Sequence, residues 1–190
     1  MERKLAAILA ADVAGYGRLM GVDEEGTLSA LRGHREVAVG LVATHRGLVF
    51  GSAGDSMVAE FPGAVEAINC AVEIQLEMDE RNEPVPQDSR LQFRVGLTIG
   101  DAMVEAGNLL GDGVDIALRL RDLAEPGGIC VTRNIYVQAR HNVSVAFESL
   151  GHHQIGNIVD SVSVYRVLLG GTRRRPRIVR WLQSIRHHKA

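Results

Sequence analysis

The chain has 190 residues, of which 46% are hydrophobic and 23% are charged, and its formal net charge is −2. This length and composition fit one globular domain with an aliphatic core, because only 4% of the residues are aromatic. They exclude attraction to nucleic acid or to a membrane through the overall charge. The two cysteines, Cys70 and Cys130, imply no disulfide framework, and the short apolar N-terminal run lacks a signal-peptide pattern. We therefore expect a soluble, cytoplasmic protein.

The first predicted element is a buried strand. Residues 5–13 form a continuous apolar run interrupted near its end by Asp12, as is typical of a strand covered on both faces. A glycine-containing loop is expected at 15–17. The acidic start at Asp23 then predicts a helix whose apolar positions keep helical spacing until it ends near Gly47.

A hairpin is predicted next. Residues 47–53 and 56–61 are short apolar runs on either side of Gly54 and Asp55, and a glycine tolerates the positive φ that such turns need. Pro62 is expected to open the following helix, where its missing N–H costs nothing.

The second half of the chain predicts more strands around one helix. Residues 91–99 are expected to form a strand, 103–105 its partner, and 107–111 the connection to a third helix that starts near Asp112. That helix should end before the stop signal EPGG at 125–128. The remaining strands are predicted at 129–132, 146–150 and 162–168.

This order of elements defines the expected fold. Strand, helix, hairpin, helix and strand in succession predict an α+β domain with a ferredoxin-like split βαβ sheet and helices on one face. Because the other face then needs a partner, a dimer is expected. We expect the domain to cover residues 1–169, followed by a basic C-terminal tail at 170–190.

Five separated motifs carry a family resemblance. They are ILAADVAGY, GSAGDSMVAEF, RVGLTIGD, LLGDGVDIALRL and AEPGGICVT. In this order and spacing, over roughly residues 4–168, they resemble the class III adenylate and guanylate cyclase catalytic domain. The resemblance implies a cyclase of intracellular signalling that converts ATP, or else GTP, to the 3′,5′-cyclic nucleotide and pyrophosphate. It also implies two Mg²⁺ or Mn²⁺ ions per site at a dimer interface.

The resemblance assigns roles to individual residues. Asp12 and Asp55 match the metal-binding aspartates, with the Val13 carbonyl as a backbone ligand. Arg94 matches an arginine that binds the triphosphate, and Arg119 matches the arginine that stabilises charge at the transferred phosphoryl group.

Backbone N–H groups around Gly15 and Tyr16 match the segment that wraps the phosphates. In the family, metal ligands come from one subunit, and the residues that read the base and stabilise the transition state come from the other.

Four positions depart from the family pattern. Gly51 stands where a purine-reading lysine is common, and Asn108 stands where its aspartate partner is common. Asp115 replaces an asparagine one helical turn before Arg119, where the carboxylate would share a helix face with that arginine. Gly156 takes the place of a lysine that grips the triphosphate in many members.

These departures leave three accounts open. The chain is a weak or altered homodimeric cyclase, a metal-bearing subunit that works with a more complete chain in a heterodimer, or a degenerate cyclase domain that binds nucleotide without turnover. The basic tail after Arg173 suits an amphipathic helix for a membrane surface, a partner protein or nucleic acid, and equally suits a solvated tail.

Overall fold

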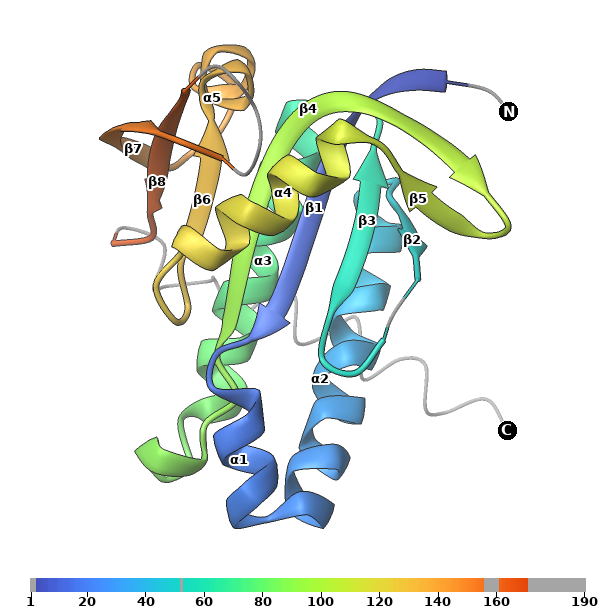
Figure 1. The fold of residues 1–190 in the computed structure, drawn as a ribbon. Helices are drawn as coiled ribbons and strands as arrows, with labels where there is room; N and C mark the ends of the chain where they lie inside the picture. Colours follow the sequence, from blue (N-terminus) through green and yellow to red (C-terminus); the bar gives the residue numbers. More distant parts are fainter. Residues whose placement is uncertain (1–2, 52, 156–160, 171–190) are drawn as a thin grey trace, which may run out of the picture.

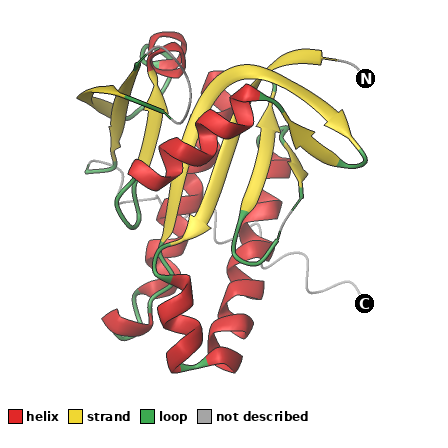
Figure 2. Ribbon diagram, in the orientation of Figure 1, coloured by secondary structure: helices red, strands yellow, loops and turns green. Residues whose placement is uncertain are grey.

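A computed structural model describes residues 3–51, 53–155 and 161–170 (Figures 1 and 2). Its elements, in chain order, are β1 Arg3–Val13, α1 Tyr16–Val22, α2 Glu24–Thr44, β2 Leu48–Phe50, β3 Met57–Phe61, α3 Ala64–Asn82, a 3₁₀ turn Gln87–Ser89, β4 Phe93–Glu105, β5 Asn108–Leu110, α4 Asp112–Leu123, β6 Ile129–Thr132, α5 Arg133–Ala139, β7 Ala146–His153 and β8 Val162–Leu168.

The strands of the described residues form one sheet of eight strands in the order β2-β3-β1-β4-β6-β8-β7, with β5 paired to β4. Strand β1 is antiparallel to both of its neighbours, β3 and β4. The order β2-β3-β1-β4, with α2 and α3 as the two crossover helices, is the ferredoxin-like split βαβ arrangement. The predicted fold class is therefore confirmed.

Helices cover both faces of this sheet (Figure 1). Alternate residues of β1, such as Leu9 and Ala11, face the main core, which is shared with α2, α3 and α5. Ile8 and Ala10 face the other side and pack against Val114 and Ala117 of α4 in a smaller core. The expectation that helices lie on one face thus holds for α2, α3 and α5, whereas α4 lies on the opposite face.

Two local expectations were wrong. The predicted loop at 15–17 instead begins α1, whose buried Leu19 gives this short helix a contact with the core. The predicted partner strand at 103–105 is the end of β4 itself, and the partner is β5, because the tight turn lies at the positive-φ residues Ala106 and Gly107.

The cysteines and the tail complete the description. Cys70 and Cys130 are buried free thiols, and burial raises the pKa of Cys70 to about 12 and that of Cys130 to about 11. The basic tail and Gly156 lie outside the described residues. None of the helices in the described residues has the length and hydrophobicity of a membrane-spanning segment.

Acid is expected to destabilise the fold through His34 of α2. This imidazole is buried, its Nδ1 bonds the Ala30 carbonyl, and its Nε2 has no partner among the described residues. Burial, with a smaller contribution from the charge of Arg81, lowers the pKa of His34. The unfolded chain therefore binds this proton more readily, so stability should fall as the pH drops below about 6.5. Urea unfolding between pH 5 and 8 measures the free energy of unfolding at each pH. The dependence of this free energy on pH should be weaker in His34→Leu.

Candidate functional site

The first predicted metal ligand, Asp12, lies at the end of β1 beside β4. Asp12 is 7% exposed, and Arg94 is its direct cross-strand partner in the register of β1 and β4. The Arg94 guanidinium binds it with two hydrogen bonds, Nε to Oδ1 at 2.9 Å and Nη2 to Oδ2 at 2.7 Å. A nearly buried carboxylate is stable only when paired in this way.

The second predicted ligand, Asp55, approaches the same strand end. Its Oδ2 accepts a hydrogen bond from the backbone N–H of Val13 at 3.0 Å. The turn that carries Asp55 is positioned by Gly54, which has a positive φ of 59° and whose carbonyl accepts a hydrogen bond from Arg35 of α2. The structure thus brings Asp12 and Asp55 to one edge of the sheet, as the sequence predicted.

The negative charge of Asp55 also acts on Arg94. The pKa of Arg94 is raised first by its hydrogen bonds to Asp12 and further by the charges of Asp12, Asp122 and Asp55. Arg94 is therefore held as a cation among carboxylates. Arg94 is thus the counter-ion of a predicted metal ligand, a role the sequence did not reveal.

Arg121, which the sequence reasoning missed, joins this cluster from α4. Its Nε lies 3.2 Å from Asp12 Oδ2 and donates a hydrogen bond to Asp122 Oδ1 at 3.2 Å. Its Nη2 donates to the same Asp122 oxygen at 2.9 Å, and its Nη1 donates to Ser56 Oγ at 3.5 Å. An arginine next to an aspartate near a helix end is typical of a solvated surface. Only the position of α4 on the sheet shows that Arg121 points at β1.

The two predicted base-reading positions also meet. Gly51 has a positive φ of 53°, and a Cβ built on it would lie 3.2 Å from Asn108 Oδ1 of β5. Gly51, which follows β2, and Asn108 of β5 therefore lie next to each other. Among the described residues, Asn108 is the member of this pair that can offer side-chain hydrogen bonds to a base.

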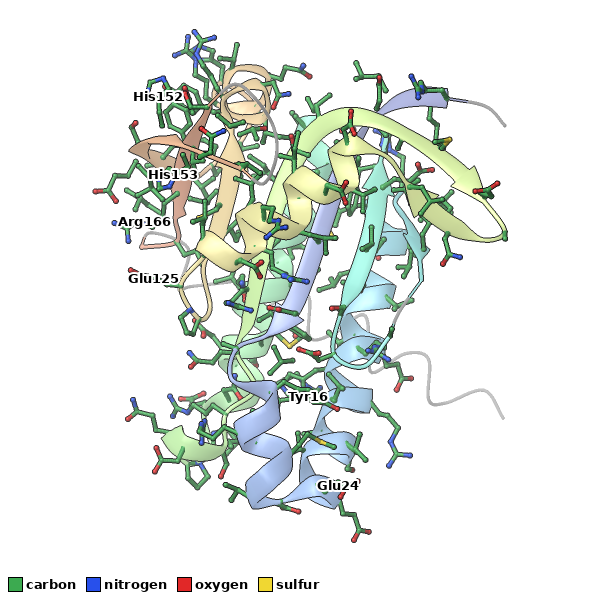
Figure 3. All side chains as sticks on the ribbon, in the orientation of Figure 1. Tyr16, Glu24, Glu125, His152, His153 and Arg166 are labelled. Carbon is green, nitrogen blue, oxygen red and sulfur yellow. The ribbon has the colours of Figure 1, made fainter. Side chains whose placement is uncertain are left out.

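The predicted transition-state residues stand apart from the carboxylates. Asp115 and Arg119 are both exposed on α4, and no ion pair joins them in the described structure, although their spacing allows one. Neither pairs with Asp12 or Asp55. Gly15, with a positive φ of 66°, precedes α1, and Tyr16 is the first residue of that helix and packs against the main core (Figure 3).

The donors at the sheet edge fit a hard divalent cation in number and type. Mg²⁺ is bound by one or two carboxylates together with substrate phosphates, rather than by a closed protein cage. Asp12 and Asp55 supply two such carboxylates, and the described residues contain no group of three or more acidic, histidine or cysteine side chains placed to hold a metal. Asp12 and Asp55 therefore suit a divalent cation as carboxylate ligands.

The fold and this edge define the architecture of a nucleotide cyclase domain. A search of family models found no match. A solved structure, the "Adenylate/Guanylate Cyclase/Hydrolase" from Silicibacter pomeroyi, is 39% identical in sequence and superposes with a TM-score of 0.79. The match covers 88% of this chain and 98% of that chain. The chain therefore belongs to the class III adenylate/guanylate cyclase family.

Two other relatives agree in fold or sequence. A Rhizobium meliloti (strain 1021) protein named "Putative adenylate cyclase 3" is 40% identical over 166 residues, which cover 87% of this chain. The adenylyl cyclase CyaB from P. aeruginosa is 17% identical with a TM-score of 0.76, covering 88% of this chain and 95% of that one, and it shares the fold. The chain spans 28% of the length of the Rhizobium protein.

Proposed function

We propose that this chain is a nucleotide cyclase domain that converts a nucleoside triphosphate, ATP by default, to the 3′,5′-cyclic nucleotide and pyrophosphate. The ribose 3′-oxygen bonds to the α-phosphorus and loses its proton, and the bond from that phosphorus to the oxygen bridging to the β-phosphorus breaks. The observation that carries this proposal is the meeting of Asp12, Asp55 and Arg94 at one sheet edge of a cyclase fold.

Asp12 and Asp55, with the Val13 carbonyl, would hold the divalent cations. When bound, two Mg²⁺ or Mn²⁺ ions activate the 3′-oxygen and neutralise the leaving pyrophosphate. Arg94 already carries a guanidinium to this edge, where it can bind the triphosphate in the bidentate way that suits phosphate oxygens. The backbone at Gly15 and Tyr16 would border the phosphates.

A second chain is needed to complete the site. Arg119 lies exposed on α4 and pairs with none of the carboxylates of its own chain in the described structure. We propose that Arg119, with Asp115 one helical turn before it, acts at the Asp12 and Asp55 site of a partner copy. Two chains would then form the active unit. A homodimer is the first choice, and a heterodimer with another cyclase chain is the alternative.

Removing the Asp55 carboxylate should abolish turnover. Asp55→Asn keeps the shape of the side chain but removes a charge that the cations need, so cyclic product formation with ATP or GTP and Mn²⁺ should fall at least about a hundredfold. Chromatography of the cyclic product measures it. Asp79→Asn, an exposed aspartate of α3, is the matched control and should leave the rate unchanged.

A non-catalytic nucleotide-binding or regulatory module is the rival function. It is favoured by Gly51, whose missing side chain leaves the base without the usual lysine, and by the polar but altered Asn108. The unchanged chain would then give no product, and Asn108→Asp with Asp115→Asn should restore it. Gly51→Lys is added last, because a side chain at a positive φ of 53° costs roughly 1 kcal/mol. Rescue only by mixing with another cyclase chain would indicate the heterodimer.

A further inference from the structure

The side chain of Arg121 contacts the Asp12 carboxylate, where a divalent cation is proposed to bind. The Nε of Arg121 lies 3.2 Å from Asp12 Oδ2, the oxygen that also accepts the 2.7 Å hydrogen bond from Arg94. Asp12 therefore carries two guanidinium groups, although one alone would neutralise its charge. Asp122 also belongs to this cluster, since it accepts hydrogen bonds from Arg121 and lies 3.8 Å from Arg94 Nη2. Arg121 is the arginine of the cluster to which no role has been assigned.

Arg121 is fixed in this position rather than merely near it. Its side chain is 14% exposed, its Nε and Nη2 both donate hydrogen bonds to Asp122 Oδ1, and its Nη1 donates to Ser56 Oγ. Ser56 directly follows Asp55, so the guanidinium contacts one predicted metal ligand, Asp12, and the chain neighbour of the other. The helix that carries it cannot shift easily, because α4 lies against β4 at Gly96, where a Cβ would come within 2.4 Å of the Arg121 backbone nitrogen.

A divalent ion and this guanidinium compete for the same oxygen. Mg²⁺ binds carboxylate oxygens at about 2.1 Å, so an ion on Oδ2 would stand directly beside the Arg121 cation. Two positive groups that close repel each other strongly in a site screened from water. The binding of one therefore requires the other to leave.

We infer that Arg121 competes with the divalent cation for Asp12: it contacts the Asp12 carboxylate and must be displaced before metal binds there. This inference rests on the proposed metal site at Asp12 and Asp55. In this arrangement two predicted functional groups, Asp12 and Arg94, are held by the chain itself.

Metal affinity without nucleotide tests the competition. Mn²⁺ binding to the full chain, followed by the electron paramagnetic resonance signal of free Mn²⁺, should be at least about tenfold tighter in Arg121→Gln than in the wild type. Arg140→Gln removes the same charge from an exposed arginine at the end of α5, whose guanidinium contacts Tyr136, and should leave the affinity unchanged. Equal affinities, within twofold, in wild type and Arg121→Gln would overturn the inference.

Two further measurements separate this inference from the proposed function. Asp12→Asn should abolish binding in both backgrounds; if Mn²⁺ binds nowhere, the metal site fails and the competition fails with it. If Mn²⁺ binds at Asp12 equally well with and without Arg121, only the competition fails. Should Arg121→Gln not fold, Mg²⁺ titration of the wild type followed by the Arg Nε–Hε resonances decides, because the Arg121 signal must shift with the binding curve and an unmoved signal contradicts displacement.

Discussion

Replacing Gly96 by alanine is expected to destabilise the domain by about 3 kcal/mol and to move α4. A Cβ at this position would lie 2.2 Å from the carbonyl oxygen of Ala117 and 2.4 Å from the backbone nitrogen of Arg121. Both atoms belong to the helix backbone, so no side chain can rotate away to make room. The whole helix must shift from the sheet or the strand must bend.

Chemical denaturation measures this loss, and Gly40→Ala is its control. Gly40 is an exposed residue inside α2, and a Cβ there meets no atom within 4 Å. Alanine should therefore stabilise that helix by roughly 0.5–1 kcal/mol, since glycine is the poorer helix former. A Gly96→Ala protein as stable as the wild type would show that α4 does not pack on β4 at this distance.

Movement of α4 should also affect the proposed chemistry. The helix carries Arg121, which reaches Asp12, and Arg119, which is proposed to serve the partner copy. Gly96→Ala should therefore reduce cyclic product formation even at temperatures where the variant is fully folded. A far-ultraviolet spectrum like that of the wild type, together with lost activity, would locate the defect in the position of the helix.

The sequence predicted those parts of the fold that depend on local patterns. The apolar run ending at Asp12, the hairpin at Gly54 and Asp55, and the helix after Asp112 all have strong periodicity or turn signals, and all three are present. The loop expected at 15–17 was wrong because one buried residue, Leu19, is enough to hold a seven-residue helix. Such a tertiary contact leaves little trace in a sequence.

The residues of the site that lie at strand ends were predictable from the sequence. The residue that α4 contributes, Arg121, was not. Asp12 and Asp55 flank adjacent strands, so their approach follows from the sheet order. The contact of Arg121 with Asp12 depends instead on α4 lying on the face opposite to α2 and α3, at a distance set by Gly96. No periodicity distinguishes the two faces of a sheet buried on both sides.

Asp12→Ala is expected to cost both activity and stability. It removes a proposed metal ligand, so cyclic product formation should fall at least about a hundredfold. It also leaves the Arg94 and Arg121 guanidiniums, whose side chains are 25% and 14% exposed, sharing Asp122 alone where they had shared two carboxylates. The repulsion between two partly buried guanidiniums that share one carboxylate should lower the free energy of unfolding by about 2–3 kcal/mol.

A double-mutant cycle separates the two effects. In Asp12→Ala with Arg121→Gln, one of the two repelling cations is gone, so part of the lost stability should return while turnover stays absent. Added NaCl should likewise narrow the stability gap between Asp12→Ala and the wild type, since it screens the remaining repulsion. Asp79→Ala, on the exposed surface of α3, should show neither effect. Strictly additive effects of the Asp12 and Arg121 substitutions on the free energy of unfolding would contradict this expectation. They would mean that the 3.2 Å contact between the two side chains contributes no interaction energy.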